Sequence, residues 1–311
     1  MKHILILTLL ALIITSCKEE KSTQESSDAA LTAAPKVKLS LAEWSYHKAL
    51  FGNEMSNLEF AAKAASLGFE GLEYVNQFFP DKATNMAYLD SMKAVADAAG
   101  VKSLLIMIDR EGYLGDLDST KRNEAVENHK KWVDAAAYLG CHSIRVNAHG
   151  EGSAEEVAAA ATDGLHKICL YAAGKNINVI VENHGGYSSD GNWLSNVMKQ
   201  VNLPNCGTLP DFGNFCIKRE GGDMYSGKCI DEYDKYKGVE EMMPYAKALS
   251  AKAFDFDENG NEVSIDFAKM FAIAKNAGYD GYWGVEYEGE NLGEEEGIIK
   301  TRDLILKVAG M

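Results

Sequence analysis

A repeating order of segments constrains the fold of this chain more than any other feature. Short apolar runs alternate along the sequence with longer segments whose apolar residues recur at three- and four-residue spacing, which is typical of strands alternating with amphipathic helices. The strand-like runs are residues 39–46, 71–75, 102–108, 142–147, 178–183, 206–212, 248–256 and 282–288. The clearest helical segments are residues 57–68, 86–100, 122–140 and 266–278.

Glycines lie at the junctions between these segments. A helical segment ends in glycine and a strand-like run follows at once in "SLGFEGLEYV", "DAAGVKSLLIM", "YLGCHSIRV" and "NAGYDGYWGVEYE". Glycine adopts the left-handed conformation that ends many helices. Eight such strands predict an α/β fold, a single-domain (β/α)8 TIM barrel with a parallel sheet. A doubly wound open sheet is the alternative, but no GxGxxG motif follows the first strand.

The N-terminus has the features of a secretion signal. Lys2 and His3 precede an apolar stretch from Ile4 to Ile14, which is shorter than the roughly 20 residues that a membrane-spanning helix needs. The stretch "LIITSCKEE" resembles a bacterial lipoprotein signal, which implies that Cys17 is lipidated. An ordinary cleaved signal is the alternative.

The resulting division of the chain has three parts. Residues 1–16 are expected to be the signal peptide, residues 17–36 a polar, flexible tether after the lipidated cysteine, and residues 37–311 the barrel. We therefore expect an extracytoplasmic protein anchored to the membrane through lipid, in the periplasm or at the outer membrane. "CKEE" also resembles signals that send some lipoproteins to the cell surface.

Five cysteines follow Cys17, and their spacing contains no CxxC or Cys/His pattern of a zinc finger. Cys216 and Cys229 bracket the glycine-rich stretch "IKREGGDMYSGK". Because an extracytoplasmic compartment permits disulfides, we predict a disulfide between these two residues, across the loop that follows the sixth strand. Free buried thiols are the alternative.

Polar residues lie at the carboxyl ends of most of the strand-like runs, as in "NVIVENHGG" at residues 178–186. The carboxyl ends of the strands form the active site of such barrels, so these side chains are expected to share one rim. The expected rim residues are Trp44, His47, Glu73, Asp109, Asn147, His149, Glu182, Asp211, Asn214, Lys252, Asp255, Glu286 and Glu288.

Several of these residues lie in motifs that resemble those of a known family. "VIVENHGG", "LPDFGNF", the lysine in "ALSAKAFDFD" and "GYDGYWGVEYEG" are similar to motifs of the xylose isomerase-like TIM barrels, often called sugar phosphate isomerases/epimerases. The resemblance implies that Glu182, Asp211 and Glu286 hold a divalent metal at the barrel mouth. Ser250 stands where the family has a histidine ligand. Asn214 stands where the family commonly has another histidine.

The departure at Ser250 bears on the metal. A hydroxyl is a weaker ligand than imidazole, and the remaining ligands are carboxylates, so Mg²⁺, Mn²⁺ or Ca²⁺ is expected rather than zinc. Alternatively, Lys252 neutralises the carboxylates and no metal is bound.

The resemblance also implies proton transfer next to a carbonyl of a sugar. Glu182 and Glu286 would remove and return the proton, Lys252 would stabilise charge, and His184 would bind a hydroxyl or carry a proton. The residues expected to bind the carbohydrate substrate are Trp44, Glu73, Asn147, His149, Trp193 and Asn214.

The expected function is therefore an extracytoplasmic sugar isomerase or epimerase. A keto-sugar lyase or hydratase needs the same base and remains open, as does a non-catalytic sugar-binding lipoprotein. The net charge of −15, with 46 acidic and 31 basic residues, disfavours nucleic acid as a partner and a DNA-repair nuclease as the function.

Overall fold

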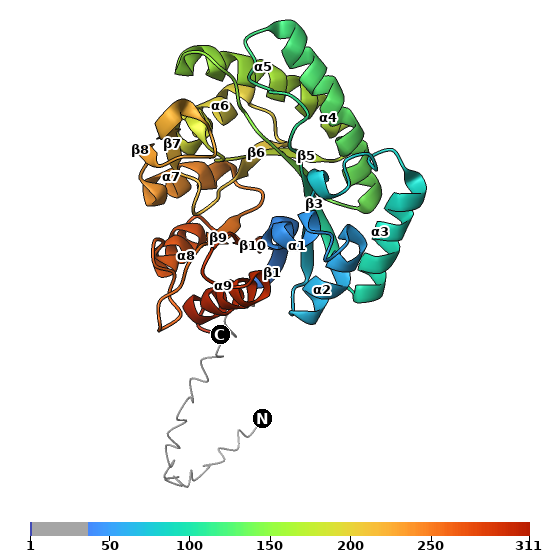
Figure 1. The fold of residues 1–311 in the computed structure, drawn as a ribbon, viewed down its shortest axis with the longest axis vertical. Helices are drawn as coiled ribbons and strands as arrows, with labels where there is room; N and C mark the ends of the chain where they lie inside the picture. The colour runs from blue at the N-terminus through green and yellow to red at the C-terminus, as the bar shows by residue number, and fades with distance from the viewer. Residues whose placement is uncertain (2–36) are drawn as a thin grey trace. The chain divides into compact units, whose positions relative to one another are not determined.

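Eight parallel strands form the centre of the molecule in a computed structural model that describes Met1 and residues 37–311 (Figure 1). The hydrogen-bonded order is β6-β5-β4-β3-β2-β1-β10-β9. Bridges between residues 208 and 246 and between residues 211 and 250 connect β6 to β9 and close the barrel. The strands are β1 Lys38–Ala42, β2 Gly71–Val75, β3 Lys102–Met107, β4 Ser143–Val146, β5 Asn178–Glu182, β6 Cys206–Leu209, β9 Ser250–Ala253 and β10 Tyr282–Tyr287. The predicted TIM barrel and its eight strands are confirmed.

Helices surround the strands, as Figure 1 shows. They are α1 His47–Phe51, α2 Phe60–Ser66, α3 Met86–Ala99, α4 Ser119–Leu139, α5 Ala154–Ala173, α6 Gly191–Val201, α7 Lys235–Met242, α8 Phe267–Asn276 and α9 Glu294–Val308. Gly100 and Gly140 end α3 and α4 with φ of 70° and 80°, in the left-handed region. These two glycines confirm the helix stops that the sequence predicts.

The apolar side chains form two layers. The larger layer lies between the strands and the helices and includes Leu41, Leu72, Ile144, Val179 and Val285. A smaller cluster fills part of the barrel interior and consists of Ala42, Val75, Leu105, Met107, Ile180, Leu209 and Ala248. Because this interior cluster is small, the barrel also holds polar side chains, and these form the floor of the site described below.

A two-stranded antiparallel hairpin interrupts the barrel between β6 and α7. It consists of β7 Cys216–Arg219 and β8 Cys229–Glu232. A disulfide joins Cys216 to Cys229, with a Cα–Cα distance of 5.8 Å, so the predicted disulfide is confirmed. The other cysteines of the described chain, Cys141, Cys169 and Cys206, are buried free thiols. We call residues 216–232 the stapled hairpin.

The expected signal peptide, Cys17 and the tether lie outside the described residues, so the structure does not bear on them. None of the helices within the described part of the chain is long and apolar enough to cross a bilayer.

Candidate active site at the carboxyl ends of the strands

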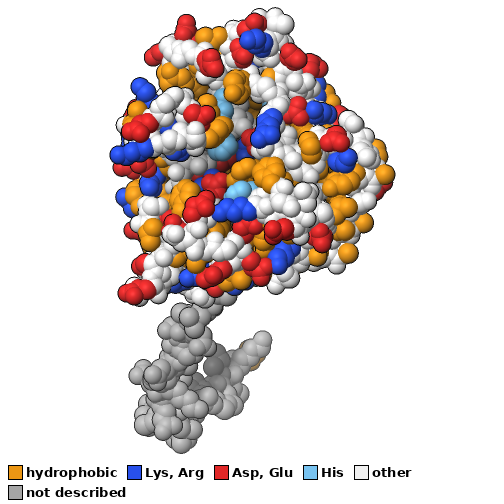
Figure 2. All heavy atoms as spheres, in the orientation of Figure 1, with side chains coloured by type: hydrophobic (Ala, Val, Ile, Leu, Met, Phe, Trp, Pro, Cys, Tyr) orange, Lys and Arg blue, Asp and Glu red, His pale blue; other side chains and the backbone are white. Residues whose placement is uncertain are grey.

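A cavity of about 500 Å³ opens at the carboxyl ends of the strands. Figure 2 shows histidine side chains beside acidic and hydrophobic ones around a hollow in this face. The rim residues that line the cavity, as the sequence predicts, are Trp44, Asp109, Asn147, His149, Asn214, Lys252, Glu286 and Glu288. His184 lines it as well. Its volume is within the range of sites that hold small organic ligands.

Three buried carboxylates come together and form the floor of the site; Glu286 lines the cavity, whereas Glu182 and Asp211 are not among its lining residues. Glu182 ends β5, Asp211 follows β6, and Glu286 lies near the end of β10. One oxygen from each carboxylate lies within 4.8 Å of the other two, and all three side chains are buried. Parallel strands place their carboxyl ends at the same rim, which explains how residues so distant in sequence meet.

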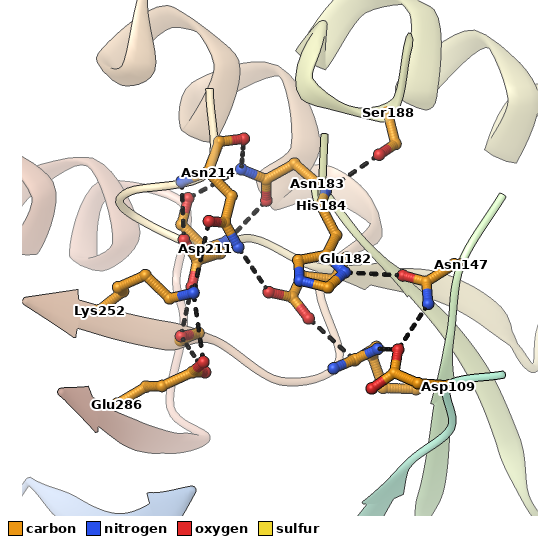
Figure 3. A network of polar contacts seen from close by, with 12 residues as sticks. Asp109, Asn147, Glu182, Asn183, His184, Ser188, Asp211, Asn214, Lys252 and Glu286 are labelled. Carbon is orange, nitrogen blue, oxygen red and sulfur yellow. Dashed lines mark hydrogen bonds and ion pairs between the residues drawn. The ribbon is translucent and has the colours of Figure 1, made fainter. Parts of the chain in front are cut away.

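Lys252 lies among these acids (Figure 3). Its Nζ is 3.2 Å from Glu286 Oε1, 2.9 Å from Glu288 Oε2 and 3.8 Å from Asp211 Oδ2. The side chain is buried, and burial alone would lower the pKa of Lys252; Asp211, Glu286 and Glu288 instead raise it well above its usual range. Lys252 therefore stays charged and partly neutralises the cluster.

Arg145 is a second buried cation at the floor. Its Nε lies 2.8 Å from Glu182 Oε2, and its Nη1 donates to Asp109 Oδ1 at 2.9 Å. The Asn214 amide donates to Glu182 Oε1 at 2.9 Å from the opposite side, so both oxygens of Glu182 have polar partners from the chain. These contacts hold the carboxylate of Glu182 in one orientation; Figure 3 shows the one from Asn214.

The pKa values of the buried acids shift in different directions, although burial by itself raises all of them. Burial raises the pKa of Glu286 to about 8, and the neighbouring acids add to this effect while Lys252 opposes it. Burial also raises the pKa of Glu182, against the opposing effects of Arg145 and Lys252. Burial alone would raise the pKa of Glu288, but Lys252 and the Trp44 indole lower it. Such divergent carboxylates are typical of sites that transfer protons.

The two histidines at the mouth are held neutral. Burial, and then the nearby Arg145, lowers the pKa of His184 to about 4. Burial lowers the pKa of His149 to about 3. His184 Nδ1 lies 3.1 Å from Asn147 Oδ1, and the Asn147 amide donates to Asp109 at 2.8 Å. At neutral pH these imidazoles can hydrogen-bond to polar groups of a ligand without carrying charge.

The carboxylate oxygens of the floor are suitable ligands for a divalent cation. Glu182, Asp211 and Glu286 offer hard oxygen ligands close together, which suits Mg²⁺, Mn²⁺ or Ca²⁺. The Ser250 hydroxyl donates to Asp211 Oδ2 at 2.6 Å and to Glu286 Oε2 at 3.3 Å, so it links two of the acids. The site thus fits a hard cation, with the Lys252 ammonium as a competitor for the same negative charge.

Two residues expected to bind substrate do not line the cavity. Glu73 points into the barrel interior on β2, where the Ser40 hydroxyl donates to its Oε1 at 2.6 Å. Trp193 lies in the first turn of α6, where its indole donates to the Ala154 carbonyl at 2.9 Å and stacks on Tyr187. Partners outside the cavity occupy both side chains, so the structure does not place either residue in the substrate site.

The sequence analysis does not identify three residues of the site. Arg145 lies inside a strand, and the signal that points to it is a charged residue within the otherwise apolar run "SIRVN". Tyr113 and Tyr225 line the cavity from the β3–α4 loop and the stapled hairpin. Neither tyrosine is near the end of a strand-like run, so strand position could not identify them.

Comparison with known proteins agrees with the barrel fold. Residues 61–308 match the family described as xylose isomerase-like TIM barrel. A curated relative, the C-glycoside deglycosidase alpha subunit of Arthrobacter globiformis, is 37% identical over 70 residues, which is 22% of this chain. The match covers only 19% of that relative's length.

Solved structures share the fold at low sequence identity. The 3-keto-D-glucoside 4-epimerase of E. coli is 14% identical with a TM-score of 0.65, and the match covers 88% of this chain and 100% of that one. The D-psicose 3-epimerase of Clostridium cellulolyticum H10 is 14% identical with a TM-score of 0.64, covering 88% and 99%. A xylose isomerase-like protein of Mycobacterium smegmatis in complex with magnesium is 16% identical with a TM-score of 0.60, covering 81% and 87%.

Proposed function

The chain belongs to the xylose isomerase-like TIM barrel family, and we propose that it isomerises or epimerises a carbohydrate by moving a proton next to a carbonyl. One observation carries the proposal: the buried carboxylates of Glu182 and Glu286 lie close together beside two buried cations, and Glu286 lines a ligand-sized cavity. Sugar epimerases and isomerases among proteins of the same fold support a sugar-modifying function.

Glu182 and Glu286 are the pair that we assign to proton transfer. Arg145 and Asn214 orient the Glu182 carboxylate, and Lys252 lies 3.2 Å from Glu286. One carboxylate removes the proton from the carbon next to the carbonyl, and the electron pair moves onto the carbonyl oxygen. The other returns a proton to the opposite face or to the neighbouring carbon. Lys252 stabilises the negative charge on the oxygen.

We further propose that Glu182, Asp211 and Glu286 hold a divalent cation, with Mg²⁺, Mn²⁺ or Ca²⁺ preferred over Zn²⁺ because all three ligands are carboxylates. When bound, such a cation stabilises negative charge on substrate oxygens. The magnesium complex of the Mycobacterium smegmatis relative supports this assignment.

The proposal includes the location of the enzyme. The leader ending in "ITSC" supports an extracytoplasmic lipoprotein anchored through Cys17, in the periplasm or at the outer membrane. A phosphorylated substrate is uncommon outside the cytoplasm, so we propose a free sugar, a keto-sugar or a glycoside. The name of the E. coli relative, a 3-keto-D-glucoside 4-epimerase, favours the keto-sugar.

Turnover of a panel of ketoses and 3-keto-glucosides, followed by NMR, tests the function. We expect a new epimer or isomer with the wild type and none with Glu182→Gln, which keeps the size of the side chain but cannot act as a base. A product that has lost its substituent would instead identify a lyase. Equal turnover by wild type and Glu182→Gln would contradict the assignment of the base. Absence of turnover across the panel with sugar binding retained would favour the sugar-binding lipoprotein.

A further inference from the structure

One wall of the cavity consists of four rings on four different segments. Tyr113 lies in the β3–α4 loop, His149 follows β4, His184 follows β5, and Tyr225 lies in the stapled hairpin. The ring centroids of Tyr225 and His184 are 5.1 Å apart, and those of His149 and His184 are 6.3 Å apart in a stacked arrangement. Tyr113 and Tyr225 both contact His149, with centroids 6.0 Å and 6.1 Å away. We call these four residues the ring wall.

The ring wall offers accessible aromatic surface to a ligand. Tyr225 is 57% exposed and Tyr113 is 48% exposed, although both line the cavity. Trp132 and Phe212, by contrast, are fully buried in the core. Exposed rings that converge on one cavity favour a flat apolar partner, because stacking on it removes apolar surface from water.

The stapled hairpin holds Tyr225 in place before any ligand arrives. The disulfide closes the base of the hairpin, and Arg219 inside it donates to the carbonyls of Met224 and Gly227 at 3.2 and 3.0 Å. Asp223 Oδ1 accepts from the Tyr225 backbone N–H at 2.8 Å. A ring that is ordered in advance loses less conformational entropy when it binds a ligand.

The hairpin also packs closely on the barrel rim. Gly185, directly after His184, has φ of 90°, and a Cβ there would lie 2.8 Å from Met224 Cγ. Only glycine permits this approach without strain. The contact places the tip of the hairpin, and with it Tyr225, against the loop that carries His184.

We propose that the ring wall is a second subsite that binds the aglycone ring of a glycoside, so that the substrate is a glycoside whose sugar carries a keto group and not a free monosaccharide. This inference rests on the proposed sugar chemistry at Glu182 and Glu286 and adds the substrate class. The aglycone presents a flat apolar face, supplied either by an aryl group or by the C–H face of a second sugar.

Binding of unreactive glycosides tests the subsite without turnover. The probes are methyl β-D-glucoside, phenyl β-D-glucoside and cellobiose, which lack the carbonyl that proton transfer needs. We expect the wild type to bind the phenyl glycoside more tightly than the methyl glycoside in calorimetry. Tyr225→Ala should weaken phenyl glycoside binding by about 3- to 10-fold, the loss of one aromatic contact, and leave methyl glycoside binding unchanged.

Three variants serve as comparisons. Tyr225→Phe should bind like the wild type because it keeps the ring, and Tyr113→Ala should repeat the loss. Tyr187→Ala removes a ring that stacks on Trp193 outside the cavity and should change nothing. If the affinity for cellobiose changes across these variants in the same way as the affinity for the phenyl glycoside, the aglycone is a second sugar. If only the affinity for the phenyl glycoside changes, the aglycone is an aryl group.

The proposal is overturned if the wild type does not distinguish phenyl from methyl glycoside, if it binds neither, or if Tyr225→Ala weakens both equally. If the protein prefers the phenyl glycoside but turns over no keto-sugar, the subsite is supported and the proposed reaction is contradicted. The two failures are therefore distinguishable.

Discussion

Two buried cations determine how the residues of the site work together. Five acids belong to the site, and each of them contacts one of these two cations. Arg145 contacts Asp109 and Glu182, and Lys252 contacts Asp211, Glu286 and Glu288. Unpaired buried charges are costly, so each cation stabilises the ionised acids that it touches. The acids still outnumber the cations, so ionisation of all five leaves an excess of negative charge that a divalent metal would balance.

Substitution of Ser250 tests the metal ligands. Ser250→His restores the family ligand beside Asp211 and Glu286, so Mn²⁺ or Zn²⁺ should bind more tightly, whereas Asp211→Asn should abolish binding. Both changes are measured by calorimetry on chelator-stripped protein. If neither changes binding and the wild type takes up no cation at millimolar concentration, the metal assignment falls. Lys252→Ala should then cost more activity than loss of any carboxylate except the base.

Glu73 gives a prediction for stability against pH. Burial raises its pKa from 4.5 to about 7, and its Oε2 has no hydrogen-bond partner in the described chain. The folded protein therefore holds a proton on Glu73 that the unfolded chain releases, so stability falls as pH rises from about 4.5 to about 7, by on the order of 3 kcal/mol.

Glu73→Gln keeps an acceptor for the Ser40 hydroxyl and cannot ionise. Its free energy of unfolding, measured by urea denaturation from pH 4.5 to pH 8, should lose this decline, and the variant should be more stable than the wild type at pH 8. Parallel pH curves for the two proteins would show that Glu73 is not protonated in the folded state.

At the scale of elements, the alternation of the sequence determines the barrel, and the cavity wall depends on segments outside that alternation. Buried parallel strands have apolar residues on both faces, so continuous apolar runs such as residues 178–183 and 282–288 can be recognised as strands in the sequence. The polar residues at the ends of these two runs point to Glu182 and Glu286. Arg145 cannot be identified in this way because it lies inside a strand and not at the end of one. Tyr225 cannot be identified in this way either, because the fold of a long loop, not local periodicity, brings it to the rim.

The stapled hairpin gives a prediction at this scale. Cys216→Ser with Cys229→Ser removes a link that closes 13 residues, which the chain-entropy model values at about 3 kcal/mol. We expect a lower melting temperature and weaker phenyl glycoside binding, with the barrel retained. Calorimetry of unfolding and circular dichroism measure these effects. An unchanged melting temperature and unchanged phenyl glycoside binding would show that the disulfide does not order the hairpin.

At the scale of the whole molecule, the expected leader and the barrel suggest an enzyme held at a membrane by its N-terminus. The polar segment of residues 18–36 is long enough to separate a lipidated Cys17 from the domain that begins near residue 37. The barrel would then act on carbohydrate outside the cytoplasm.

Fractionation of cells tests the anchor. Cys17→Ala should move the protein from the membrane fraction to the soluble fraction, because each buried methylene of an acyl chain contributes about 0.8 kcal/mol to membrane binding. Residues 37–311 expressed alone serve as the soluble control. A Cys17→Ala protein that still sediments with membranes after a high-salt wash would contradict lipid anchoring.

The central claim is that Glu182 and Glu286 move a proton next to a carbonyl, and exchange of that proton with solvent tests it most directly. A substrate identified by turnover is incubated in D₂O, and NMR follows the C–H signal beside the carbonyl. We predict that the wild type replaces this proton with deuterium, and that Glu182→Gln and Glu286→Gln each remove exchange at one of the two positions or faces, with their folds intact. Conversion of the sugar without deuterium incorporation, or exchange that persists in both variants, would contradict the account.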